Sequence, residues 1–120
     1  MDISEELNDH WLASLLSALG STGDEVAGTL RGAGARGTPA DFRNDPVAAY
    51  VAAQVHVLLP DTADVDVAAT ADEVVVGVYT IFPGFGSLEV SAPTPGPVED
   101  FMDRFDALED YRDLELDHAA

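Results

Sequence analysis

The apolar residues of this chain change their spacing near residue 60, which limits the folds that the chain can form. Up to Leu58 they recur every three or four positions, as in helices that bury one face. From Asp64 they alternate with polar residues or run continuously, as in strands. Beyond Pro97 the helical spacing returns. Helices followed by strands and one more helix predict an α+β fold and not an alternating α/β fold.

Three segments in the first half carry helix signals. The first spans residues 3–19 and has a wide apolar face that includes Trp11. The second begins with the capping box Thr22-Gly23-Asp24-Glu25, and the third begins at Asp45-Pro46, where Asp45 can cap and proline suits the first helical position. We therefore predict three N-terminal helices.

Three strands are predicted next, at residues 64–69, at residues 73–82 and around Leu88 and Val90. Short turn segments separate them, so they should form a three-stranded antiparallel meander. The second segment is a near-continuous run of Val, Tyr, Thr and Ile, which predicts a central strand covered on both faces.

The chain has the length of one domain, and we predict a single domain over residues 1–120. Trp11, Phe101 and Phe105 should anchor its core, with the first and last helices packed on the sheet or on the third helix. The sequence contains no cysteine, which excludes disulfides and thiolate metal sites. Its acidic start differs from a secretory signal, and the apolar run of residues 11–19 is too short to cross a bilayer. We expect a soluble, cytoplasmic protein.

The net charge restricts the class of partner. The chain has 23 acidic residues, five arginines and no lysine, so its formal charge is −18. Such a chain is repelled by nucleic-acid backbones and anionic membranes, and it is attracted to basic protein surfaces. Two other interpretations stay open: the acidity keeps the protein soluble, or it reflects a high-GC genome or adaptation to high salt.

A stripe of six carboxylates marks the last segment, at spacings of four, three, four, three and four residues: Glu99, Asp103, Asp106, Asp110, Asp113 and Asp117. This spacing predicts that they share one face of a C-terminal acidic helix. Like charges in line destabilise a helix, so high salt or a basic partner should relieve them. These six residues are the candidate partner-binding site.

Candidate residues for catalysis or metal binding do not form a recognisable motif. The three histidines, His10, His56 and His118, are far apart in sequence, and no pair has metal-ligand spacing. No serine lies in a Gly-x-Ser-x-Gly motif. We therefore expect a protein that is not an enzyme and has no cofactor or metal.

One stretch resembles a known family. Leu30-Arg31-Gly32-Ala33-Gly34-Ala35-Arg36-Gly37, a loop, and Asp45-Pro46-Val47-Ala48-Ala49-Tyr50 resemble a group of small, mostly uncharacterised actinobacterial proteins, as does Pro97 followed by Phe101, Phe105 and Asp106. The resemblance covers about residues 26–112. Asp45 stands where that group tends to have cysteine. The resemblance implies a cytoplasmic single-domain protein and no defined activity.

Two classes of function follow. The first is a non-enzymatic binding factor of the inhibitor, immunity or antitoxin type, whose acidic surface docks on a basic protein and could mimic a nucleic acid. The second is a small-molecule-binding domain with a site bounded by Tyr50, Tyr79, Phe82 and Phe85, or an accessory subunit whose acidity reflects its host. Salt separates the first class from a small-molecule site, because ionic strength weakens a charge-driven complex and hardly affects an apolar pocket.

Overall fold

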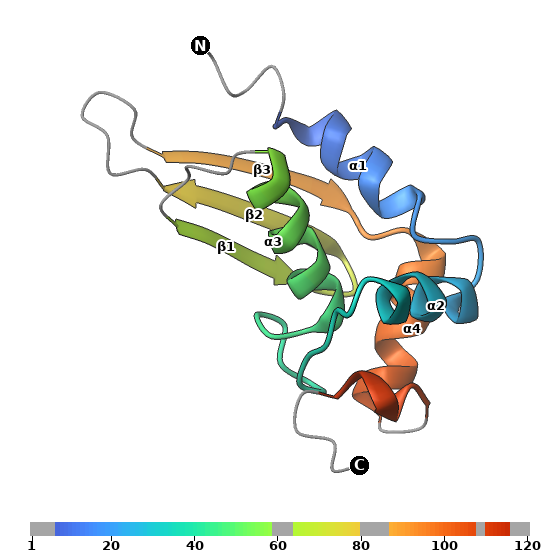
Figure 1. Cartoon of the computed structure of the whole chain (residues 1–120). Coiled ribbons are helices and arrows are strands. Elements are labelled where there is room, and N and C mark those ends of the chain that lie inside the picture. The colour runs from blue at the N-terminus through green and yellow to red at the C-terminus, as the bar shows by residue number, and fades with distance from the viewer. Residues whose placement is uncertain (1–6, 59–63, 80–86, 108–109, 116–120) are drawn as a thin grey trace.

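The computed structural model of the chain describes residues 7–58, 64–79, 87–107 and 110–115. It confirms the α+β class, with three helices, a three-stranded sheet and a final helix (Figure 1). The elements are α1 (Asp9–Ser17), α2 (Gly23–Gly32), α3 (Pro46–Leu58), β1 (Asp64–Ala69), β2 (Glu73–Tyr79), β3 (Ser87–Pro93), α4 (Gly96–Asp106) and a short 3₁₀ helix (Arg112–Leu114).

Local capping explains where α2 and α3 begin. The Thr22 hydroxyl accepts the Glu25 N–H at 3.1 Å and a Glu25 carboxylate oxygen accepts the Ser21 N–H at 3.0 Å, which is a capping box displaced by one residue. Asp45 accepts the Val47 N–H at 2.7 Å at the start of α3. Helix α1 begins at Asp9, later than predicted, and residues 3–6 of that prediction lie outside the described residues.

The sheet is the predicted antiparallel meander, in the order β1-β2-β3. Val76 pairs with Val67 on one side and Val90 on the other, so these three side chains share one face. Helix α3 packs on β1 and α1 packs on β3, both over this face (Figure 1). The core therefore lies between these two helices and one face of the sheet.

The prediction that β2 is covered on both faces is wrong. Val74, Val76 and Val78 are buried under the helices, whereas Glu73 and Tyr79, on the opposite face, are exposed. Every second residue of β2 thus points away from the core, and a run of valines does not by itself require burial on both sides. Residues 80–82 of the predicted strand lie outside the described part of the chain.

Helices α2 and α4 pack against each other beside the sheet (Figure 1). The expectation that the last helix packs chiefly on the sheet or on α3 is therefore wrong, whereas that for α1 is confirmed. Phe101 and Phe105 are buried as predicted and stack with ring centroids 5.7 Å apart. Trp11 is only partly buried, because the buried face of α1 is centred on Leu12 and Leu16.

Candidate docking surface

The six-carboxylate stripe does not lie on one continuous helix. Helix α4 ends at Asp106, so Glu99, Asp103 and Asp106 are on it, while Asp110 and Asp113 are not. Asp117 lies outside the described residues. The predicted single acidic face is therefore wrong beyond Asp106.

After α4 the chain leaves the helical path, because the side chains of Tyr111 and Leu114 then pack against the rest of the fold. Tyr111 has a left-handed backbone (φ 63°), and its ring stacks on Phe101 with centroids 5.0 Å apart. Leu114 is buried, and its carbonyl accepts the Gly37 N–H at 2.9 Å. A continuing helix would direct Tyr111 and Leu114 away from these partners.

Three stripe residues are engaged within the fold. Asp106 accepts the Ala40 N–H at 2.9 Å, and Asp110 pairs with Arg104 at 2.9 Å. Asp113 forms a bidentate pair with Arg31, which holds the pKa of the Asp113 carboxyl below its usual range. Neutralising these three residues would remove contacts within the fold as well as surface charge.

Arg104 joins α2, α4 and the segment after α4. Its guanidinium lies 2.9 Å from Asp110, 3.3 Å from Asp100 and 3.5 Å from Asp24, and 4.9 Å above the centre of the Tyr111 ring. The Tyr111 hydroxyl also donates to Asp24 at 2.6 Å. Burial and this hydrogen bond raise the pKa of the Tyr111 hydroxyl to about 12. One cation thus holds together three parts of a strongly acidic chain.

Other carboxylates have no such partner. Four of the five arginines are in ion pairs with acidic side chains. Among the described residues, six exposed acidic side chains form no hydrogen bond or ion pair: Asp64, Asp72, Glu73, Glu89, Glu99 and Asp103. The fold leaves a surplus of negative charge on its surface, at the sheet and on α4.

We expect this surplus to make stability depend on salt. Because the acidic residues far outnumber the arginines, repulsion should outweigh the ion pairs, and screening should stabilise the folded state. The melting temperature should rise by on the order of 5 °C from low to moderate salt, which corresponds to about 1 kcal/mol. Thermal melts in a sodium chloride series measure this rise. An unchanged melting temperature would show that the charges are already dispersed.

The unpartnered acidic residues of the sheet lie on its open face, opposite the helices. Glu89 and Asp66 are the cross-strand neighbours of Gly77, and Asp64 is the neighbour of Tyr79. Tyr79 is 48% exposed. The open face therefore has an exposed aromatic ring with carboxylates on the strands on either side.

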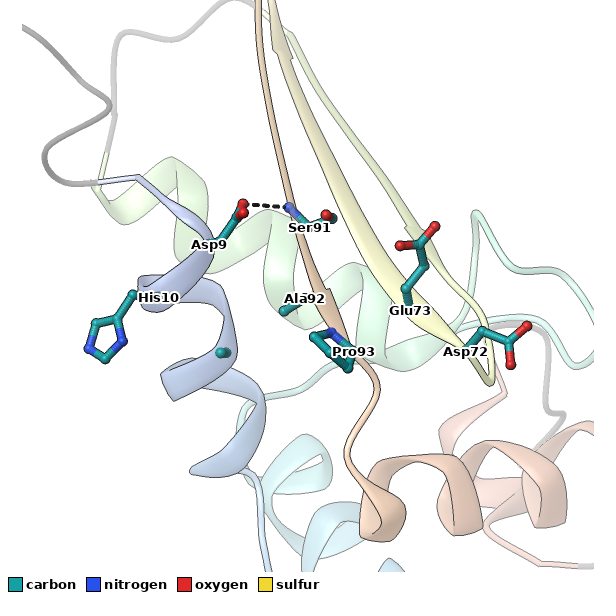
Figure 2. Close-up of a pocket in the computed structure, with 8 residues that line it drawn as sticks. Asp9, His10, Asp72, Glu73, Ser91, Ala92 and Pro93 are labelled. Atoms are coloured by element: carbon teal, nitrogen blue, oxygen red, sulfur yellow. Dashed lines mark hydrogen bonds between the residues drawn. The ribbon is translucent and has the colours of Figure 1, made fainter.

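A shallow hollow of about 570 Å³ lies where α1 meets the end of β3 (Figure 2). Asp9 reaches across and accepts the Ser91 N–H at 2.9 Å, which caps the outer edge of the sheet. His10 points away from the strands (Figure 2). Asp72 and Glu73 line the other side of the hollow. Three acidic residues and no arginine line it, so an anionic ligand is unsuited to it.

The aromatic site predicted for a small molecule is not assembled as expected. Tyr50 lines a hollow of about 330 Å³ between α3 and the loop after α2, together with Arg36 and Gln54. Tyr79 lies on the opposite side of the sheet from α3. Phe82 and Phe85 lie outside the described residues. Tyr50 and Tyr79 cannot bind one small molecule together.

Asp45 lies at the start of α3, as the sequence predicted, and its carboxyl is also buried. Asp45 is only 1% exposed, and the one hydrogen bond of its carboxyl to the described residues comes from the Val47 N–H. Burial, with a smaller contribution from the charge of Asp106, raises the pKa of the Asp45 carboxyl to about 7, although the Val47 N–H opposes this rise. Nothing in the sequence around Asp45 predicted that its carboxyl would be buried or would interact with the charge of Asp106 on α4.

No three His, Asp or Glu side chains lie close enough to hold a metal ion in the part of the chain that the structure describes. None of the helices described there is both long and apolar enough to span a bilayer. Comparison with known proteins finds no matching family model, no similar curated protein and no similar solved structure. The resemblance to the actinobacterial group stays a prediction.

Proposed function

We propose that this protein is a non-enzymatic binding factor that docks through its acidic surface on a basic surface of another protein. An inhibitor, an immunity protein or an antitoxin-like factor would act in this way. The observation that carries the proposal is a set of six exposed carboxylates that have no partner among the described residues, in which four of the five arginines pair with acidic side chains. A basic partner would supply the missing cations.

The negative charge of the surface also supports a particular class of partner, a protein whose basic groove binds nucleic-acid phosphates. Rows of carboxylates on a compact domain can occupy a site that otherwise binds nucleic-acid phosphates, since both present regularly spaced negative charges. Complementary charge chiefly speeds association and selects the partner. A nucleic-acid-binding protein with a basic groove is therefore the partner class that we propose.

The test compares a variant that removes charge from α4 with one that keeps it. Glu99→Gln with Asp103→Asn removes two charges whose side chains have no partner among the described residues. The control is Glu99→Asp with Asp103→Glu, which keeps both charges and alters side-chain length. Immobilised wild-type protein captures basic proteins from the host at low salt, and association rates of each purified candidate are then measured in a salt series.

We expect the wild-type association rate to fall steeply with salt, because screening weakens steering. The neutral variant should associate about two- to fivefold more slowly at low salt if rim charges each contribute a few tenths of a kcal/mol. The charge-keeping control should resemble the wild type. The proposal fails if no captured protein binds in a salt-dependent way.

A further inference from the structure

The open face of the sheet lacks a covering layer among the described elements, because α1 and α3 both pack on the other face. Its central strand presents Glu73, Val75, Gly77 and Tyr79 on this side, as the alternation of a strand requires. Val75 is partly exposed and Tyr79 is about half exposed. An apolar and aromatic strip therefore runs along the middle of the open face.

Gly77 allows the Tyr79 ring to lie across this strip. A Cβ atom placed at Gly77 would be 3.1 Å from the Tyr79 hydroxyl and 3.4 Å from two of its ring carbons, tighter than a normal contact for the hydroxyl. Glycine weakens a strand interior, and it marks places where another group comes close. The glycine keeps the ring low on the sheet with part of its surface open to solvent.

Carboxylates lie on both neighbouring strands. Asp64 on β1 is directly opposite Tyr79, and Glu89 on β3 is directly opposite Gly77. Side chains at opposed positions on one face lie about 5 Å apart at Cβ, and diagonal neighbours lie within reach of long side chains. The side chains of Asp64 and Glu89 have no hydrogen bond or ion pair with the described residues. A cation seated on the ring would have a carboxylate on either side.

At the β1 edge of the sheet, beside α3, the fold already holds one guanidinium between a carboxylate and a ring. Arg43, from the loop before α3, pairs with Asp66 at 2.7 Å and lies 5.6 Å from the centre of the Phe42 ring. Asp66 is the β1 neighbour of Gly77. This intramolecular contact combines a carboxylate of β1 with an aromatic ring, and Tyr79 with Asp64 and Glu89 offers the same combination with no arginine paired to it in the described part of the chain.

We propose that the open face of the sheet is the docking surface, and that its occupant is an arginine-bearing segment of the basic partner. One guanidinium stacks on the Tyr79 ring and pairs with Asp64 and Glu89. Arginine suits the site better than lysine, because its planar group stacks on a ring and binds carboxylates in a bidentate manner. This inference rests on the proposed function and locates the site that the proposed function uses.

The test uses an octa-arginine peptide as the probe, with an octa-lysine peptide for comparison. Tyr79→Leu keeps apolar bulk and removes the ring, whereas Tyr79→Phe keeps the ring. Asp64→Asn with Glu89→Gln removes two charges from the sheet, and Glu99→Gln with Asp103→Asn removes two from α4 as a matched control. Dissociation constants come from titration calorimetry, amide shifts from NMR spectroscopy of the labelled protein, and circular dichroism verifies that each variant folds.

We expect Tyr79→Leu to weaken octa-arginine binding about two- to fivefold, the range for an exposed cation–π contact, and Tyr79→Phe to stay within twofold of the wild type. The sheet variant should weaken binding more than the α4 variant. Octa-lysine should bind more weakly than octa-arginine, and amide shifts should be largest at Gly77, Tyr79 and Glu89.

Equal effects of the sheet and α4 variants, or shifts that are largest on α4, would overturn this site and leave the proposed function standing. Equal losses in Tyr79→Leu and Tyr79→Phe would overturn the role of the ring. The host-protein measurements test the proposed function separately: a salt-dependent partner that binds the sheet variant normally supports the function and contradicts this site.

Discussion

Replacing Asp45 with asparagine should remove much of the pH dependence of stability between pH 4 and pH 8. The Asp45 carboxyl is buried, and its pKa is raised to about 7, compared with about 4 in an unfolded chain. Between these values the folded protein keeps a proton that the unfolded chain releases. Wild-type stability should therefore fall as the pH rises through this window and level off above it.

The magnitude follows from linkage. A difference of about three pKa units corresponds to about 4 kcal/mol between pH 4 and pH 8 in the wild type, and this contribution is absent in the variant. Asparagine can still accept the Val47 N–H, but its buried amide leaves a donor without an acceptor among the described residues, which costs about 1–3 kcal/mol at every pH. The slope with pH is thus the clean measure. Urea unfolding at several pH values provides it.

Asp41→Asn is the matched control. Asp41 lies four residues before Asp45, and hydrogen bonding to the Asn44 side chain lowers its pKa. Its contribution therefore has the opposite sign: it is present above the pKa of the unfolded chain and is lost as the pH falls. If Asp45→Asn unfolds with the same pH profile as the wild type, Asp45 is ionised normally in the folded protein.

Replacing Phe105 with alanine should lower the free energy of unfolding by about 3–5 kcal/mol. Phe105 is 1% exposed and stacks on Phe101, in the layer where α4 packs on α2. Its removal leaves a cavity beside a ring that also supports Tyr111. Denaturant unfolding at fixed pH and salt measures the loss.

Phe42→Ala removes the same number of atoms from an exposed position, since Phe42 is 51% exposed. We expect this control to change stability by less than about 1 kcal/mol. Equal effects of the two substitutions would mean that α4 and α2 do not form the tight layer described above.

The starts of α2 and α3 were predictable from the sequence because their causes are local. Thr22 and Glu25 are three residues apart, and Asp45 and Pro46 are adjacent, so the cap can be identified without knowledge of the fold. The change from helical to alternating spacing identified the strands for the same reason. What these signals could not give is the position of α4 on α2, because packing between segments so far apart in the sequence has no local pattern.

The end of α4 is the clearest example. The spacing of Asp103, Asp106, Asp110 and Asp113 is compatible with a helix, and no glycine or proline interrupts it. The helix nevertheless ends at Asp106. The segment that follows is held by two contacts with the N-terminal part of the chain, Asp113 with Arg31 and Tyr111 with Asp24. Each pair is more than 80 residues apart in the sequence. Tertiary contacts overrode periodicity here.

The open face of the sheet left a weaker sequence signal. In the valine-rich run, Glu73, Val75, Gly77 and Tyr79 occupy alternate positions, and the glycine among them is typical of close approach by another group. The buried positions Val74, Val76 and Val78 are uniformly valine. The alternation therefore existed, but because Val75 is also apolar, the run indicated burial on both sides.

The mutual packing of α2 and α4 also affects how the chain is made. Synthesis proceeds from the N-terminus, so α2 leaves the ribosome long before the residues that cover it. Phe101, Phe105 and Leu114, which are buried in the folded chain, emerge only after α2. Until then the apolar face of α2 has no α4 to pack on. A truncated chain that stops before α4 would leave this apolar face of α2 without its cover.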